Sequence, residues 1–147
     1  MTPTLELLRA SGILRPIDVH LARGLCRMGA EPDPMVALAV ALTSRHVGKG
    51  HVCLDLDRLV AESARELAPP GTDPAILEAL ASCDWPSAEV WRAAVAASSL
   101  TGSDGRPLVI DPAGRLFLAR YHGHQSDLGA GLLSRSALRR ADVDEDV

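Results

Sequence analysis

An uninterrupted run of apolar residues from Met35 to Leu42 constrains the fold of this chain more than any other feature of its sequence. Asp33 and Pro34 precede the run. An Asp side chain accepts hydrogen bonds from the N–H groups of a helix's first turn, and proline at the first helical position loses only an N–H that would have no helical partner. A helix is therefore predicted to begin at Pro34. Because a helix that is apolar on all sides has no face for solvent, it must be covered by other elements.

The residues that follow this helix predict a turn and then a strand. Gly48 and Gly50 favour the backbone conformations that end a helix. From His51 to Leu56 the side chains alternate, with Val52, Leu54 and Leu56 apolar, at the two-residue period of a strand. A buried central helix is thus expected to lead through a short turn into a half-buried strand.

Further helices are predicted on both sides of the central helix. The segment that begins at Arg15 and Pro16 has Ile17, Leu21, Leu25 and Met28 at helical spacing, so these four are expected to face inward. Other helices are expected from Thr2 to Gly12, after Asp57, after Asp73 and Pro74, and from Ser87 to Leu100.

A β-hairpin is predicted near the end of the domain. Two apolar runs, 108–110 and 116–119, flank Asp111-Pro-Ala-Gly114, a sequence typical of turns. Because an isolated hairpin is only marginally stable, we expect it to pair with the strand at 51–56. The fold class is therefore α+β and mainly helical, with a buried central helix, surrounding helices and a small antiparallel sheet. Residues 1–140 are expected to form a single domain, and residues 141–147 an acidic tail.

Composition excludes several classes of protein. The chain has 147 residues and a formal net charge of −4, which gives no overall attraction to nucleic acid. Cys26, Cys53 and Cys83 form no C-x-x-C pair, so neither a disulfide framework nor a thiolate zinc site is expected. No apolar run approaches the ~18 residues that a membrane helix needs. We expect a cytoplasmic protein without membrane contact.

The sequence contains no recognisable catalytic constellation. A phosphate-binding loop needs G-x-x-x-x-G-K-[ST], and the Gly48-Lys49-Gly50 segment has no glycine at the required offset, so it is interpreted as a turn. His46, His51 and Cys53, with His122 and His124, form only a weak version of a zinc site. We therefore expect this chain to hold no metal and no cofactor, and not to be an enzyme by itself.

Two groups of residues have open interpretations. Arg115, Arg135, Arg139 and Arg140 could form a basic strip that touches DNA, or an ordinary solvated surface. Trp91 is equally consistent with core packing and with a partner interface, where tryptophan is enriched.

Three stretches of the chain resemble one family. They are L-R-P-I-D-V-H-L-A-R at 14–23, T-S-R-H-V-G-K-G-H-V-C-L-D-L-D-R-L at 43–59 and R-P-L-V-I-D-P-A-G-R-L-F-L-A-R-Y at 106–121. In this order they resemble the amino-terminal domain of RecD, the alpha subunit of exodeoxyribonuclease V in RecBCD-type helicase/nucleases. None of them is a catalytic motif. The aromatic and acidic residues that usually follow Tyr121 in this family are replaced here by His122-Gly-His124.

The resemblance implies a function in double-strand-break repair and recombination. It implies a non-catalytic domain that docks an ATP-driven 5′-to-3′ DNA helicase motor onto a RecC-like gamma subunit, in a complex with a RecB-like beta subunit. ATP and Mg would then be expected only in a motor domain further along a longer polypeptide. The expected partner interface comprises Trp91, Phe117, Arg120 and Tyr121. The alternative is an accessory domain that guides DNA to the motor, through the unit at 44–56 or the arginines named above.

Overall fold

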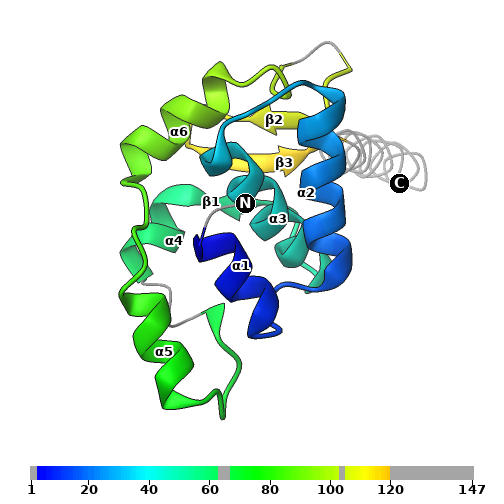
Figure 1. Cartoon of the computed structure of the whole chain (residues 1–147). Coiled ribbons are helices and arrows are strands. Elements are labelled where there is room, and N and C mark those ends of the chain that lie inside the picture. Colours follow the sequence, from blue (N-terminus) through cyan, green and yellow to red (C-terminus); the bar gives the residue numbers. More distant parts are fainter. Residues whose placement is uncertain (1–2, 63–66, 103–104, 120–147) are drawn as a thin grey trace, which may run out of the picture.

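The computed structural model describes residues 3–62, 67–102 and 105–119 (Figure 1). Within these residues, helices outnumber strands, and the strands form one antiparallel sheet, which confirms the predicted α+β, mainly helical class. The elements in chain order are α1 (Pro3–Ala10), α2 (Pro16–Met28), α3 (Pro34–Gly48), β1 (Leu54–Asp55), α4 (Leu56–Glu62), α5 (Pro74–Ala81), α6 (Ala88–Ala97), β2 (Leu108–Ile110) and β3 (Arg115–Leu118).

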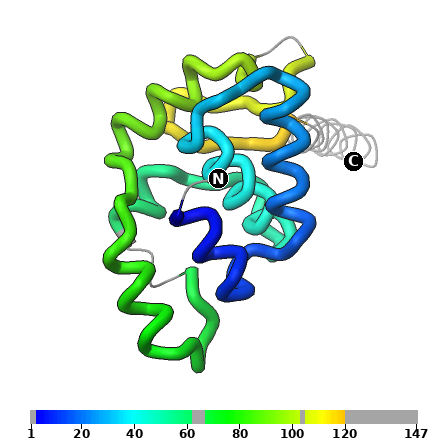
Figure 2. Tube along the Cα trace, viewed as in Figure 1, coloured from blue at the N-terminus to red at the C-terminus, as the bar shows by residue number. Residues whose placement is uncertain are grey.

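Helix α3 is the centre of the fold. It begins where the sequence predicted, because Asp33 accepts a hydrogen bond of 2.9 Å from the Met35 backbone N–H. Val36, Leu38 and every residue from Ala39 to Arg45 are buried. Figure 2 shows α3 running through the middle of the molecule, between α2 and α6. The prediction that other elements cover this apolar helix is confirmed.

The hairpin and its pairing with the earlier strand are also confirmed. The strand order is β1-β3-β2, with both pairs antiparallel. Leu54 pairs with Leu116, and Asp55 pairs with Arg115. Gly114 closes the hairpin at a φ of 81°, a conformation that glycine adopts without strain. The sheet therefore brings the hairpin beside the segment that follows α3.

The first strand is shorter than predicted. It spans only Leu54–Asp55, and the chain becomes helical at Leu56. Asp55 accepts a hydrogen bond of 3.1 Å from the Arg58 backbone N–H, so Asp55 occupies the helix start that the sequence had suggested for Asp57. Leu54 and Leu56 are buried as expected, but Val52 is 42% exposed because it lies outside the strand.

The inward face of α2 differs from the prediction. The side chains that α2 buries are those of Asp18, Val19 and Ala22. Ile17 is 62% exposed and Met28 is 85% exposed, so the predicted inward stripe is instead the outer face at both of its ends. The reason is that α2 meets α3 through the small Ala22 and through Asp18, which accepts a hydrogen bond from Ser44.

Candidate functional site

An apolar groove runs along α2 where this helix borders the end of α3 and the end of β3. It has a volume of about 780 Å³ and is bounded by α2, the end of α3 and the end of β3. Ile17 is the most exposed of its apolar residues, and Leu21 and Leu25 are half-buried within it. We call this feature the α2 groove; its lining residues are Arg15, Ile17, His20, Leu21, Leu25, Ser44, Val47, Gly48, Pro107, Leu118 and Ala119.

Arg15 fixes one rim of the α2 groove. Its guanidinium donates to Asp18 Oδ1 at 2.7 Å and to the Ser44 carbonyl at 3.2 Å. The hydrogen bond to Asp18 raises the pKa of Arg15, so this cation is permanent. Gly48, the last residue of α3, gives this side chain room, because a Cβ at this position would lie 2.3 Å from the Arg15 guanidinium and would displace it.

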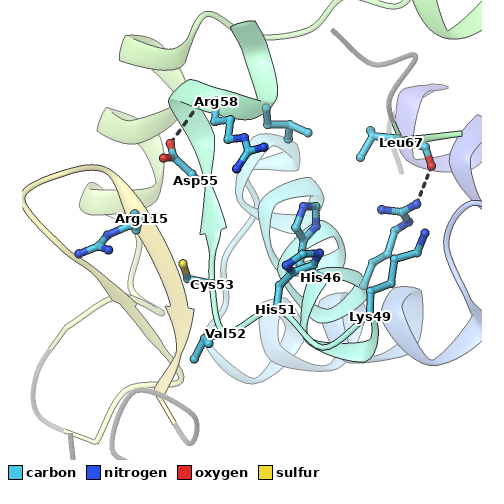
Figure 3. A pocket seen from close by; sticks show the side chains of 11 residues that line it. His46, Lys49, His51, Val52, Cys53, Asp55, Arg58, Leu67 and Arg115 are labelled. Carbon is cyan, nitrogen blue, oxygen red and sulfur yellow. Dashed lines mark hydrogen bonds between the residues drawn. The ribbon is translucent and has the colours of Figure 1, made fainter. Parts of the chain in front are cut away.

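A basic pocket lies beside the last turn of α3. It has a volume of about 490 Å³, and Figure 3 shows its walls, which come from α3, the segment up to β1, the start of α4 and β3. We call it the basic pocket; its lining residues are Arg45, His46, Lys49, His51, Val52, Cys53, Asp55, Arg58, Leu59, Leu67 and Arg115.

Arg45 places a buried positive charge in the wall of the basic pocket. Its side chain donates to the carbonyl oxygens of Ile13 at 3.0 Å and Leu67 at 2.5 Å. Burial lowers the pKa of Arg45, and the positive charge of Arg15 acts in the same direction. Among the described residues no carboxylate lies within salt-bridge distance of Arg45, so its charge is balanced only by backbone dipoles and by the more distant Asp18.

Two histidines line the centre of the basic pocket. The rings of His46 and His51 have centroids 5.6 Å apart. His46 Nδ1 lies 3.0 Å from the Leu42 carbonyl oxygen, so this nitrogen carries the proton and donates it to that oxygen. Burial lowers the pKa of His46, and the neighbouring cations Arg45 and Lys49 lower it further. The His46 ring is therefore neutral near pH 7.

The structure places only some of the predicted site residues on the surface. Trp91 is 0% exposed and Phe117 is 5% exposed, so neither side chain is available to a partner in this conformation. The Trp91 indole donates to the Met35 carbonyl at 2.9 Å, which makes it a core residue. Arg115 lies at the basic pocket, where it pairs with Asp111 at 2.6 Å. Arg120, Tyr121, Arg135, Arg139 and Arg140 lie outside the described residues.

Sequence reasoning named only part of each surface feature, with Arg115 and the unit at 44–56 on the basic pocket. Ile17 and Leu21 were both assigned to the interior, but Ile17 is 62% exposed, whereas Leu21 is half-buried and packs against the core. Arg45 and Arg58 carried no expected role, although the segment at 44–56 was a candidate for DNA contact. The predicted pairing of the hairpin with the earlier strand brings Arg115 to this segment, but the register that sets Asp55 opposite Arg115 is not specified by a local sequence pattern.

The structure locates some of the candidate metal ligands and cysteine thiols that the sequence suggested. In residues 3–62, 67–102 and 105–119, no three His, Cys, Asp or Glu side chains converge as a metal site would require. His122 and His124 lie outside these ranges. Cys53 lines the basic pocket, and burial raises the pKa of its thiol, which disfavours the thiolate. No helix in the same part of the chain has the length and apolar character needed to cross a membrane.

Comparison with known families matches residues 10–117 to a model described as the N-terminal domain of the RecBCD enzyme subunit RecD. This match covers most of the chain and includes α2, α3, β1, β2, all of β3 except Leu118, and every residue that lines the basic pocket. The chain therefore belongs to the family of RecD N-terminal domains.

Curated relatives carry the same name. The protein called RecBCD enzyme subunit RecD from Mycobacterium tuberculosis (strain CDC 1551 / Oshkosh) is 33% identical over 130 residues, which cover 88% of this chain and 20% of the relative. The protein of that name from Mycolicibacterium smegmatis is 40% identical over 110 residues, or 74% of this chain and 17% of the relative. The chain thus spans about a fifth of the length of the curated relatives it matches.

Proposed function

We propose that this chain is a non-catalytic docking domain of a RecD-type DNA helicase subunit. It holds the ATP-driven 5′-to-3′ motor of the parent polypeptide on a RecC-like gamma subunit of exodeoxyribonuclease V, in a complex that also contains a RecB-like beta subunit. The assembled complex, and not this domain alone, contacts DNA. It acts in double-strand-break repair and recombination in the cytoplasm. Membership of the RecD family and the subunit names of the relatives support this proposal.

The α2 groove is the observation that carries the docking proposal. Large apolar side chains gathered in one hollow of a protein surface mark interaction sites more often than scattered ones do. Ile17 is 62% exposed and lies in the α2 groove with Leu21 and Leu25. The proposed contact face therefore comprises α2 and the end of the hairpin. Trp91 and Phe117 are buried and do not line the α2 groove, and contact by Arg120 and Tyr121 stays a prediction.

The turn after α3 supports a non-catalytic role for this domain. A phosphate-binding loop presents free backbone N–H groups to its ligand. Here the N–H groups of Lys49, Gly50 and His51 donate to the carbonyls of Arg45, Val47 and His46 at 3.1, 3.0 and 3.0 Å. Because these donors are used to end the helix, we propose that ATP and Mg bind only to the motor of the parent protein.

Co-purification tests the docking proposal. An affinity-tagged form of this chain is co-expressed with the gamma subunit of the same organism, and the captured material is analysed by size-exclusion chromatography with light scattering. The proposal predicts a stable complex of the two chains that contains no ATPase activity. Separate elution of two folded proteins would contradict it.

A DNA-contacting accessory domain is the second candidate function. The observation that favours it is the basic pocket, which brings Arg115 beside the unit at 44–56. Titration with single- and double-stranded oligonucleotides at two salt concentrations distinguishes the two functions, because phosphate contacts give a binding constant that falls steeply with salt. Saturable binding whose affinity falls steeply with salt favours DNA contact. If neither oligonucleotide binds, the docking function is favoured.

A further inference from the structure

The basic pocket concentrates positive charge in a chain whose formal net charge is −4. Four Arg and Lys side chains line it, namely Arg45, Lys49, Arg58 and Arg115, and Asp55 is the one carboxylate among the described lining residues. A concave site lined by one sign of charge focuses the electrostatic field and attracts ions of the opposite sign. The lining therefore favours an anion and disfavours a metal cation.

Lys49 and His51 supply hydrogen-bond donors that the described part of the protein does not use. Both side chains are exposed, and neither forms a hydrogen bond or ion pair with another described residue. Lys49 is also the only lysine in the sequence. Asp55 does not neutralise them, because its Oδ1 accepts from the Arg58 backbone N–H.

The charged side chains that line the basic pocket do not all point toward its centre. Figure 3 shows the Arg58 side chain directed toward the histidine pair, with Lys49 on the opposite side. The Arg115 side chain is directed away from the histidines, and its Nε donates to Asp111. Arg45 is only 6% exposed, and its side chain bonds to carbonyl oxygens and not to a carboxylate among the described residues, so its positive charge is not neutralised there. The centre is thus bounded by Lys49, His51, Arg45 and Arg58.

We propose that the basic pocket binds a phosphate-type oxyanion, with Lys49 and His51 as its direct hydrogen-bond donors. A tetrahedral oxyanion presents several acceptor oxygens, which suits two donor side chains on the turn after α3 with the added positive charge of Arg45 and Arg58. No Phe, Tyr or Trp lines the pocket, so a nucleobase has no large aromatic ring on which to stack. The recognised group is therefore the phosphate itself, either free or carried by a nucleic acid strand.

This site is separate from the proposed docking face. The α2 groove is lined by Ser44, Val47 and Gly48 of α3, whereas the basic pocket is lined by Arg45, His46 and Lys49. Residues on opposite sides of the last turn of α3 thus line the α2 groove and the basic pocket. The inference does not rest on the docking function, and variants at Lys49 leave the lining of the α2 groove unchanged.

The single lysine allows a direct test. Reductive methylation with ¹³C-formaldehyde gives Lys49 one NMR signal that is distinct from that of the N-terminal amine. The labelled protein is titrated with inorganic phosphate, with a short oligonucleotide that lacks a terminal phosphate and with the same oligonucleotide phosphorylated at its 5′ end. We expect a saturable shift of the Lys49 signal, and shifts of the His46 and His51 ring signals at the same ligand concentrations. Saturation by inorganic phosphate alone identifies a free anion as the source, and saturation by an oligonucleotide identifies a strand.

Calorimetry on unmodified protein supplies the matched comparison. Lys49→Gln should weaken binding of the same ligand by about tenfold or more, because it removes a charged hydrogen-bond donor. Arg27→Gln also removes one positive charge, but Arg27 does not line the basic pocket. The affinity of the Arg27→Gln variant for the same ligand should therefore match that of the wild type. The proposal is overturned if none of the three ligands shifts the Lys49 signal saturably, or if Lys49→Gln and Arg27→Gln weaken binding equally.

Discussion

Ser44 of α3 donates a hydrogen bond of 2.7 Å to Oδ1 of Asp18 on α2, and both residues are buried. The same carboxylate accepts from the Arg15 backbone N–H at 2.9 Å and from the Arg15 guanidinium at 2.7 Å. Asp18 therefore caps its own helix and joins it to the central helix. This junction determines which side of α2 faces inward, and so it leaves Ile17 and Leu21 on the α2 groove.

Asp18→Asn should destabilise the domain. The variant keeps an oxygen that can accept from Ser44 but loses the negative charge that Arg15 pairs with, so we expect a loss of about 1.5–3 kcal/mol in the free energy of unfolding. Asp57→Asn is the matched control, since Asp57 forms a half-exposed ion pair with Arg92 at 3.3 Å and should cost less than about 1 kcal/mol. Urea denaturation followed by circular dichroism measures both. Equal losses would contradict the role given to Asp18.

The stability of the domain should fall in acid through Asp18. Burial by itself raises the pKa of Asp18, but hydrogen bonds from Arg15 and Ser44 outweigh it and leave the pKa below its ordinary value. A carboxylate with a lowered pKa in the folded state stabilises fully above the unfolded value, about 3.9, and this contribution disappears as the pH falls through the folded pKa. Unfolding free energies measured from pH 7 to pH 3 should converge for the wild type and Asp18→Asn. Parallel curves would show that Asp18 is not the responsible group.

Trp91→Phe tests whether this tryptophan belongs to the core. The substitution removes the indole donor to the Met35 carbonyl and replaces a fully buried ring by a smaller one, so it should cost about 2 kcal/mol through the lost hydrogen bond and the space left in the core. Trp85→Phe is the control: the Trp85 indole donates to the Leu80 carbonyl at 3.0 Å, but its side chain is only half-buried, so a smaller loss is expected. Thermal unfolding gives both values. A Trp91→Phe protein of wild-type stability that fails to bind the gamma subunit would instead place Trp91 in the interface.

Two glycine substitutions should have opposite signs. Gly50 has a φ of 91° with open space around it, so Gly50→Ala should lose about 1–2 kcal/mol from backbone strain alone. Gly24 lies inside α2 with no atom within 4 Å of an added Cβ, so Gly24→Ala should gain about 0.5–1 kcal/mol from reduced chain entropy. Chemical denaturation of both variants measures the difference. A stabilising Gly50→Ala would mean that the turn after α3 has another backbone conformation.

The parts of the fold that depend on local chemistry were predictable from the sequence. The starts of α3, α5 and α6 follow from Asp33, Asp73 and Ser87, each of which accepts from a backbone N–H within the next three residues. The hairpin follows from the turn between 110 and 115, and the burial of α3 follows from its apolar run. Each of these signals lies within a few neighbouring residues.

The errors arose where distant residues decide the structure. The periodicity of α2 identified an apolar stripe, but the helix buries Asp18 with Val19 and Ala22 and leaves Ile17 exposed. The partner of Asp18 is Ser44, which is 26 positions away. Arg45 likewise binds carbonyls at Ile13 and Leu67, which are 32 and 22 positions away. A buried polar residue fits in a core only when it has a hydrogen-bond partner. The sequence alone does not identify that partner, so it does not predict which polar residues are buried.

The affinity of this chain for the gamma subunit tests the central claim most directly. Biolayer interferometry should compare the wild type with Ile17→Ser, in the α2 groove, and with Val90→Ser, a change of similar size on α6 outside it. Ile17 is 62% exposed and Val90 is 52% exposed, so both variants should fold normally. The account predicts that Ile17→Ser raises Kd by about tenfold, or 1.4 kcal/mol, while Val90→Ser leaves it unchanged. Equal affinities for all three proteins, or a loss confined to Val90→Ser, would contradict docking through the α2 groove.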